Sequence, residues 1–166
     1  MRQGAILAID QGTTNTKALL VGLNGEILVG SSVPLTQKYP QAGWVEQDLA
    51  EIWQSVEKAI DVCLSEAENI EIKAVAISNQ RETAAIWHRQ TGKPLGPAIG
   101  WQCRRTADFC EDLRAKKLEE VLQEKTGLNL DPLFSGTKFR WLIENLENAK
   151  DEIFLGNIDA WLLWNL

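Results

Sequence analysis

The sequence predicts an α/β domain, in which a small sheet opens the chain, one helix crosses it and a further strand returns to it. Three observations lead to this prediction. Short β-prone segments fill the first 35 residues, a long amphipathic segment follows them, and a second apolar run comes after that. Composition agrees, because 45% apolar and 24% charged residues in a chain of 166 are typical of one ordinary globular domain.

The three opening strands are expected at Ala5–Ile9, Thr16–Gly22 and Ile27–Val33. An Asn-Gly pair, Asn24 and Gly25, separates the last two, and both residue types tolerate the positive φ angles of a type I′ hairpin turn. The sequence therefore predicts an antiparallel meander that contains a type I′ turn.

The amphipathic helix is expected to begin after Asp48, which together with Glu51 fits a capping box. Its apolar positions recur with helical spacing and are Leu49, Ile52, Trp53, Val56, Ala59, Ile60 and Cys63. Such a face must be buried, most simply against the preceding sheet. The next apolar run, Ile72–Ser78, shows no alternation of polar and apolar residues, which is typical of a strand buried on both faces.

The rest of the chain is expected to hold one more strand at Thr83–His88, closed by a turn at Thr91–Pro94, and then mainly helices. The predicted helices lie around Ala107–Lys116, Leu118–Glu124, Thr137–Leu146 and Ala160–Leu166. The order β-β-β-α-β at the start is that of a ribonuclease H-like domain, with a mixed sheet and flanking helices.

Charge and composition exclude several classes of function. The formal net charge is −6 and there is no block of Lys and Arg, so nucleic acid and anionic membranes are not expected partners. The apolar run Ala5–Ile9 ends at Asp10 and is too short for a signal peptide or a membrane span. The three cysteines form no C-x-x-C pair and are accompanied by a single histidine, which predicts reduced thiols in the cytoplasm and no zinc site.

The first candidate site is the segment between the first two strands, Asp10-Gln11-Gly12-Thr13-Thr14-Asn15-Thr16-Lys17. Glycine permits close approach of a ligand, successive N–H groups in a tight turn bind anions, and threonine hydroxyls add donors. Asp10 can hold Mg²⁺ through water, and Lys17 can neutralise phosphate charge. The alternative is a plain hairpin turn, in which these residue types are also common.

The second candidate site, Ser78–Thr83, follows the predicted strand Ile72–Ser78 at its carboxyl end, where α/β sheets bind their ligands. Arg81 offers a fork of donors and Glu82 a pair of acceptors, which suits hydroxyl groups on neighbouring carbon atoms. The alternative is a polar loop with an exposed ion pair.

The third candidate site is Gly100–Thr106, in which Trp101 can cover the carbon face of a polyol while Gln102 forms a hydrogen bond nearby. The alternative is a core tryptophan at a strand end, followed by Arg104 and Arg105 at the solvated start of a helix. A structural role is the better interpretation of the remaining candidates, which are His88, Cys103 and Cys110.

Five blocks that span nearly the whole chain resemble the FGGY carbohydrate kinases, and among these the glycerol kinase branch. In the family's order they are Ala8–Thr14, Gly43–Asp48, Ile77–Thr83, Trp101–Thr106 and Asp131–Lys138. The resemblance implies an actin-like ATPase lobe and the transfer of the γ-phosphate of MgATP to a terminal hydroxyl, converting glycerol to glycerol 3-phosphate.

The resemblance also implies roles for individual residues. The positions that would bind ATP phosphates are Thr13, Thr14, Asn15 and Lys17, with Asp10 near the Mg²⁺ ion. Serine is common in the family at the position of Asn15 and arginine at that of Lys17, so Lys17 contributes a point charge rather than a fork. The positions that would bind glycerol are Arg81, Glu82, Trp101, Gln102 and Leu133.

Leu133 departs from the family pattern, in which a tyrosine hydroxyl at this position forms a hydrogen bond with glycerol. A kinase for another small polyol or sugar therefore stays open, as does a non-catalytic polyol-sensing module of the same fold. A structural nucleotide-binding domain of the actin kind is disfavoured, because it has no use for the polar pair Arg81 and Glu82.

Residues 1–166 are expected to form the N-terminal part of the first lobe, which binds substrate and phosphate. The general base and the adenosine site of the family fall outside this segment. The isolated chain is therefore expected to be inactive, and the full-length protein is expected to be a homo-oligomer.

Overall fold

The computed structural model describes residues 2–146 and 152–166, and the chain divides into two compact units. Unit 1 comprises Met1–Gln37, Asp48–Gln80 and Asn165–Leu166, and unit 2 comprises Lys38–Gln47 and Arg81–Trp164. Within the described ranges, no helix is both long enough and apolar enough to cross a membrane.

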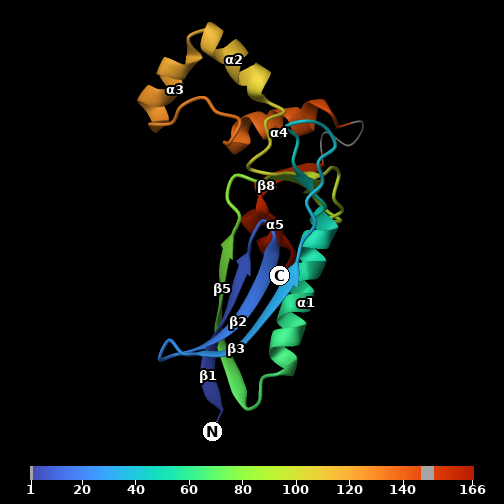
Figure 1. Cartoon of the computed structure of the whole chain (residues 1–166), viewed down its shortest axis with the longest axis vertical. Coiled ribbons are helices and arrows are strands. Elements are labelled where there is room, and N and C mark those ends of the chain that lie inside the picture. Colours follow the sequence, from blue (N-terminus) through green and yellow to red (C-terminus); the bar gives the residue numbers. More distant parts are fainter. Residues whose placement is uncertain (1, 147–151) are drawn as a thin grey trace. The chain divides into compact units, whose positions relative to one another are not determined.

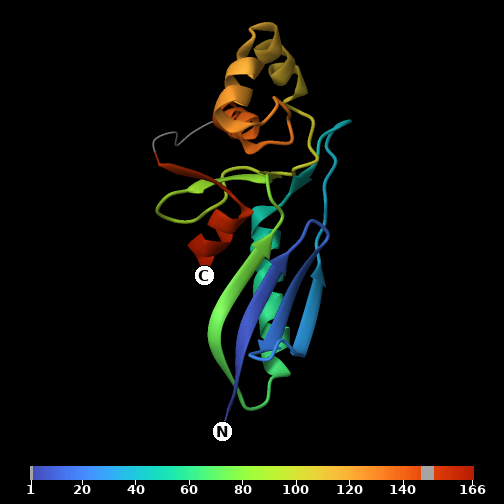
Figure 2. The same cartoon turned by 90° about the vertical axis from the view of Figure 1, so that its left-hand side faces the viewer.

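Unit 1 contains a four-stranded mixed sheet in the order β3-β2-β1-β5 (Figure 2). The strands are β1 (Gln3–Gln11), β2 (Asn15–Gly22), β3 (Ile27–Pro34) and β5 (Ile70–Asn79). The first three pair antiparallel, as the sequence predicts, and β5 pairs parallel to β1. Helix α1 (Leu49–Ser65) connects β3 to β5 and lies along one face of the sheet (Figure 1). This confirms the predicted meander followed by a crossover helix.

The core of unit 1 lies between α1 and the sheet. Alternate residues of β1 and β2 face the helix, and the buried apolar residues on both sides are Ala5, Leu7, Ile9, Ala18, Leu20, Leu49, Ile52, Val56, Ala59 and Cys63. Full burial of each larger side chain contributes about 1.5–3 kcal/mol. The predicted N-cap is confirmed, since the Asp48 side chain accepts hydrogen bonds from the backbone N–H groups of Ala50 (2.9 Å) and Glu51 (3.4 Å).

The hairpin between β2 and β3 is confirmed, but its turn is not type I′. That turn requires a positive φ at both central residues, whereas here Gly25 has φ +86° and Asn24 is not among the residues with a positive φ. The N–H of Gly25 donates to the carbonyl of Gly22 at 2.8 Å, and the N–H of Gly22 donates to the carbonyl of Glu26, also at 2.8 Å. This longer loop needs one left-handed residue only, and glycine takes that conformation without strain.

Strand β5 exists where it is predicted, but the expectation that both of its faces are buried is wrong. Ile72 is 39% exposed and Val75 is 52% exposed. The physical reason is the strand order, because β5 is an edge strand and α1 packs mainly on β2 and β3. A continuous apolar run does not distinguish an edge strand from a central one.

Unit 2 contains a second sheet, which the sequence predicts only in part. Its antiparallel strands, in the order β4-β7-β6-β8, are β4 (Glu46–Gln47), β7 (Ala98–Ile99), β6 (Ala84–His88) and β8 (Ile153–Asn157). Only β6 is predicted, since β4 and β7 are too short for any periodicity and β8 lies in a stretch expected to be helical.

The predicted helices are all present, with ends shifted by a few residues. They are α2 (Ala107–Ala115), α3 (Leu118–Thr126), α4 (Ser135–Glu144) and α5 (Ile158–Asn165). Helix α4 packs on β6, and the cluster of buried residues there is Val45, Ala84, Ile86, Ile99, Cys103 and Leu142.

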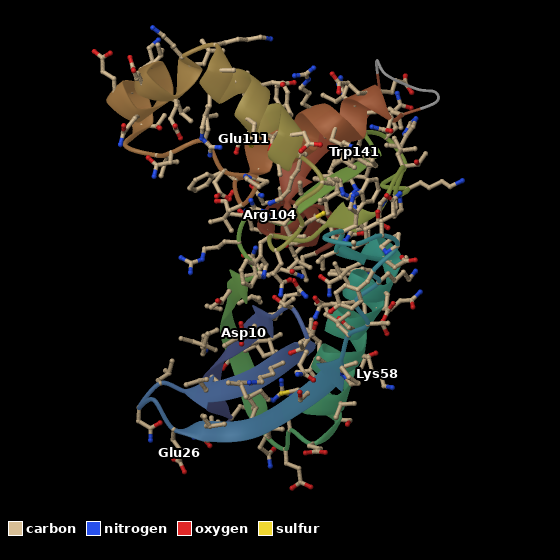
Figure 3. All side chains as sticks on the ribbon, turned by 45° about the horizontal axis from the view of Figure 1, so that its top comes forward. Asp10, Glu26, Lys58, Arg104, Glu111 and Trp141 are labelled. Atoms are coloured by element: carbon tan, nitrogen blue, oxygen red, sulfur yellow. The ribbon has the colours of Figure 1, made fainter. Side chains whose placement is uncertain are left out.

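Arg105 is part of the interior of unit 2. One interpretation of the sequence placed it at the solvated start of a helix, and for Arg105 this interpretation is wrong. Its side chain is 0% exposed and forms an ion pair with Glu46 at 2.7 Å. Its guanidinium carbon lies 3.9 Å from the ring centroid of Trp44 and 4.4 Å from that of Trp141, which is labelled in Figure 3. Two aromatic faces and a carboxylate thus compensate the buried charge. Arg104, by contrast, is exposed.

Candidate functional site

In unit 1 the candidate phosphate-binding turn joins β1 to β2 and is closed by its own backbone. The N–H of Gly12 donates to the carbonyl of Asn15 at 2.9 Å, and the side-chain amide of Gln11 donates to the carbonyl of Gly12 at 2.7 Å. A Cβ atom on Gly12 would lie only 3.0 Å from the Asn15 carbonyl oxygen. This turn therefore requires glycine because the chain approaches itself closely.

The polar side chains of the turn are partly accessible. Thr14 is exposed, and its hydroxyl accepts a hydrogen bond from the side-chain amide of Asn15 at 3.2 Å. Thr13 and Asn15 are half-buried. Hydroxyl and amide donors thus accompany the backbone of the turn, as anion binding requires.

Asp10 and Lys17 are directly opposite each other in the β1–β2 ladder, so their side chains share one face of the sheet. Both are exposed, and this face is the one away from α1; Figure 3 labels Asp10 and, on α1, Lys58. The neighbouring residue Thr16 points to the other face, where its hydroxyl lies 2.6 Å from that of Ser55 on α1. A carboxylate and an ammonium group therefore flank the turn.

These residues fit a water-mediated Mg²⁺ ion. Mg²⁺ commonly keeps several waters and takes one or two carboxylates together with substrate phosphates, and Asp10 is an accessible carboxylate at the base of the turn. In the part of the chain that the structure describes, no group of three or more His, Cys, Asp or Glu residues is placed to bind a metal. Phosphate oxygens and water would have to complete the coordination.

Two glutamines that the sequence analysis did not single out connect the ends of β1 and β5. The N–H of Gln80 donates to the carbonyl of Gln11 at 2.8 Å, and its side-chain amide donates to Oε1 of Gln11 at 3.1 Å. Both side chains are buried. They fix the carboxyl ends of two parallel strands to each other, which is the edge where ligands of such sheets bind.

In unit 2 the Glu82 carboxylate is held at the start of α4. Oε2 of Glu82 accepts hydrogen bonds from the backbone N–H of Ser135 (2.9 Å) and from its hydroxyl (2.6 Å). Ser135 is the first residue of the helix, so its N–H has no partner within α4 and lies at the positive end of the helix dipole. The alternative of an exposed Arg81–Glu82 ion pair is not seen, since Glu82 is half-buried and no described ion pair joins these residues.

Glu82 also has an unusual backbone. Its φ of +64° lies in the left-handed region, which costs a residue with a side chain about 1–2 kcal/mol. Its carbonyl accepts a hydrogen bond from Nζ of Lys138 at 2.8 Å, and the same ammonium group donates to the carbonyl of Leu133. Long-range contacts therefore stabilise a conformation that the local chain disfavours.

Lys138 is completely buried, with 0% of its surface exposed. This burial lowers the pKa of Lys138 to about 8, although the negative charge of Glu82 and weaker influences of Cys103 and Asp131 act in the opposite direction. Lys138 and Ser135 lie on the buried face of α4 together with Leu142. A lysine at a core position of a helix is the signal in the sequence that could have identified this residue.

The backbone of Trp101 is hydrogen-bonded to Thr83, the residue that follows Glu82. Its N–H donates to the hydroxyl of Thr83 at 3.2 Å, one residue beyond Glu82, and its side chain is 39% exposed. The interpretation of Trp101 as a core residue is therefore wrong. Hydrogen bonds from Lys138 to the carbonyls of Glu82 and Leu133, and from the N–H of Trp101 to Thr83, thus bring these segments together. Arg81 and Gln102 are the sequence neighbours of Glu82 and Trp101 and have exposed side chains.

His88, Cys103 and Cys110, which the sequence analysis interprets as structural, have contacts that agree with that role. Burial raises the pKa of the Cys110 thiol, which disfavours a reactive thiolate, and Cys103 is buried beside Arg105. Nδ1 of His88 accepts hydrogen bonds from the backbone N–H groups of Gln90 and Thr91, and Nε2 lies 3.1 Å from Glu152.

An apolar cavity of about 370 Å³ lies among helices α2, α3 and α4. Most of its lining is Phe109, Leu113, Leu122, Leu128, Leu130 and Phe134, and it includes none of the predicted site residues. The polar groups of the candidate site are thus separate from the larger of the described hollows in unit 2.

Residues 5–166 match the N-terminal domain of the FGGY family of carbohydrate kinases. Among curated proteins, the chain is 44% identical to a glycerol kinase of Vibrio atlanticus over 99% of its length and 45% identical to one of a Shewanella species over 100%. It covers 34% and 35% of these two relatives, respectively. The chain therefore spans about a third of the length of the relatives it matches.

Solved structures give the same result. The crystal structure of Plasmodium falciparum glycerol kinase with ADP aligns with a TM-score of 0.89 at 34% identity and covers 99% of this chain, which in turn covers 34% of that protein. Gluconate kinase of Lactobacillus acidophilus aligns over 99% of this chain and 33% of its own length, with a TM-score of 0.88 at 21% identity. These likenesses confirm the predicted fold, a ribonuclease H-like domain of the actin-like ATPase kind.

Proposed function

The chain belongs to the FGGY family of carbohydrate kinases, and from this premise we propose that it supplies the polyol site and the first phosphate-binding turn of an enzyme that phosphorylates glycerol to glycerol 3-phosphate. The observation that supports this most is the environment of Glu82. Its carboxylate is held in a conformation that the chain alone disfavours, beside the backbone of an accessible tryptophan. Conformations of this kind, which the surrounding structure has to stabilise, are concentrated at ligand-binding sites.

In this proposal the turn of unit 1 binds the phosphates of ATP. Backbone N–H groups and the side chains of Thr13, Thr14 and Asn15 donate hydrogen bonds, and Lys17 adds a positive charge. Asp10 holds Mg²⁺ through water, and the metal neutralises charge that develops on the transferred phosphate. Phosphoryl transfer depends mainly on such positioning and charge stabilisation.

Unit 2 supplies the contacts to the polyol. Arg81 donates to substrate hydroxyls and Glu82 accepts from them, while Trp101 covers the carbon chain and Gln102 adds a hydrogen bond at its edge. Leu133 contacts carbon atoms where a tyrosine of the family would reach a hydroxyl. A second candidate substrate, another small polyol or sugar, follows from this one replacement.

The three cysteines are free and buried in the structure, which supports a reducing compartment such as the cytoplasm. The homo-oligomeric state of the full-length protein stays a prediction. So does the inactivity of the isolated chain, which spans about a third of the length of the glycerol kinases it matches.

The test is ADP release by the full gene product that carries this chain, with glycerol and a panel of small polyols and sugars. We expect glycerol-dependent turnover, and Arg81→Ala should lower kcat/KM for glycerol about a hundredfold, because a charged donor to the substrate is lost. Arg81→Lys keeps the charge but not the fork of donors, so its kcat/KM for glycerol should lie between those of the original protein and Arg81→Ala. Turnover with another polyol only would change the substrate, and no turnover with any of them would favour the sensing module.

Leu133→Tyr tests the substrate more finely. If glycerol is the substrate, an added hydroxyl should lower KM for glycerol about three- to tenfold, the value of one ordinary hydrogen bond. Leu133 is 37% exposed, so a larger side chain has room. Leu133→Phe, which adds the ring without the hydroxyl, is the matched control, and an equal effect of both variants would contradict the hydrogen bond.

A further inference from the structure

We infer that Ser135 and Asn157 are positioning residues of the polyol site: they hold one oxygen of the Glu82 carboxylate, Oε2, so that Oε1 alone accepts a hydrogen bond from the substrate. This inference rests on the proposed function, since it concerns the same carboxylate. Neither residue touches the substrate in this account, because both act through Glu82.

The hydrogen bonds among these residues have a fixed direction. A carboxylate only accepts, so the Ser135 hydroxyl donates its single proton to Oε2 of Glu82 at 2.6 Å. The same hydroxyl oxygen then accepts from the side-chain amide of Asn157 at 2.7 Å. Asn157 also donates to the carbonyl of Thr83 at 3.2 Å, which fixes it to the residue that follows Glu82. The chain of donors therefore runs from Asn157 through Ser135 to Glu82.

Oε2 is fully engaged by this arrangement. It accepts both the hydroxyl and the backbone N–H of Ser135, the latter at 2.9 Å. Oε1 has no hydrogen-bond partner among the residues that the structure describes. One oxygen is thus committed to the protein and the other is available to a ligand hydroxyl.

Lys138 fixes the backbone of Glu82, the residue whose carboxylate Ser135 holds. Its buried ammonium group donates to the carbonyls of both Glu82 and Leu133, two residues assigned to the polyol. Because the left-handed φ of Glu82 is disfavoured locally, the direction of its side chain depends on these distant contacts. Loss of the Ser135 hydroxyl should therefore free the carboxylate to rotate without unfolding the turn.

The experiment compares KM for the polyol with KM for ATP in the full gene product. Ser135→Ala should raise KM for the polyol about ten- to a hundredfold, because a hydrogen bond to a charged group is lost, and should leave KM for ATP within about twofold. Ser135→Thr keeps the hydroxyl and should restore KM for the polyol to within about threefold of the original. A merely structural role for Ser135 would show no such division between the two substrates.

Asn157→Ala is the second variant and breaks the chain of donors one step away. It should also raise KM for the polyol, and the double variant Ser135→Ala/Asn157→Ala should be no worse than Ser135→Ala, because Asn157 acts through Ser135. The matched control is Ser31→Ala, which removes a serine hydroxyl that donates at the same 2.6 Å, to the carbonyl of Ala59 in unit 1. This control should change neither KM.

The inference is overturned if Ser135→Ala leaves KM for the polyol within about twofold, if KM for ATP rises in parallel, or if the effects of the two variants simply multiply. Failure of the proposed function is distinguishable. If Arg81→Ala has no effect on the polyol, the substrate site is wrong; if it has an effect and Ser135→Ala has none, only the positioning role is lost.

Discussion

The β1–β2 turn of unit 1 and the Glu82 turn of unit 2 are two polar sites built in opposite ways. The first is closed by bonds between near neighbours, such as Gly12 to Asn15, and leaves its charged residues Asp10 and Lys17 exposed. The second depends on partners 53 and 56 residues away in the sequence, and one of these is a fully buried lysine.

This difference predicts how each region responds to change. Exposed charges are screened by water, so substitution at the first turn should alter ligand binding more than stability. The buried ammonium group of Lys138 donates to two backbone carbonyls, so its substitution leaves these acceptors without their partner and should lower stability itself. The two lysines, Lys17 and Lys138, offer the most direct comparison.

Lys138→Glu should have the largest effect. It places a second negative charge in a buried site beside Glu82, and we expect a loss of about 3–5 kcal/mol in the free energy of unfolding. Lys17→Glu, on the exposed face of β2, should change it by less than about 0.5 kcal/mol. Urea unfolding of both variants measures this, and similar losses would show that the buried position of Lys138 is wrong.

The pH dependence of stability gives the next largest effect. The pKa of Lys138 is about 8 in the folded chain and near its ordinary value of 10.5 when unfolded. Between these values the unfolded chain binds more protons, so the contribution of Lys138 makes stability rise with pH, by an amount on the order of 3 kcal/mol.

Lys138→Met isolates this contribution, because Cys63 and Cys110, whose pKa values burial raises, are the same in both proteins. As the pH rises from 8 to 10.5, the unfolding free energy of the original protein should increase relative to that of Lys138→Met. A difference that does not vary with pH would contradict the lowered pKa.

Gly12→Ala tests the first turn. Because the added Cβ would lie 3.0 Å from the carbonyl oxygen of Asn15, the turn must open, at a cost of about 1–2 kcal/mol. Binding of ADP by the full gene product should weaken as well. Gly136→Ala is the control, and it should change stability in the opposite direction. A Cβ atom on Gly136 would have no neighbour within 4 Å, and alanine favours the helical conformation of α4 more than glycine does, so stability should rise by up to about 1 kcal/mol.

The smallest effect concerns the backbone of Glu82. Glu82→Gly and Glu82→Ala both remove the carboxylate, but glycine accepts a φ of +64° and alanine does not. We expect Glu82→Gly to be more stable than Glu82→Ala by about 0.5–1 kcal/mol, after the larger entropy of unfolded glycine is subtracted. The reverse order in urea unfolding would mean that the left-handed conformation is not kept.

The sequence by itself determined the parts of this protein that depend on near neighbours. Strands β1, β2 and β3 alternate or cluster apolar residues, Asp48 caps α1 with its own side chain, and Gly25 marks the hairpin. The candidate residues around Asp10, Glu82 and Trp101 could also be named, because their residue types suit phosphate and polyol. Their roles toward these ligands stay predictions.

Only the tertiary structure decided the rest. It placed β5 at the edge of its sheet, built a second sheet partly from two-residue strands, and buried Arg105 between two tryptophans. It also brought Ser135 and Lys138 to Glu82, and Asn157 to Ser135. Propensity, periodicity and capping act within a few residues and leave a pattern in the sequence, whereas the partner of a hydrogen bond more than fifty positions away is selected by packing and is not named by any such pattern.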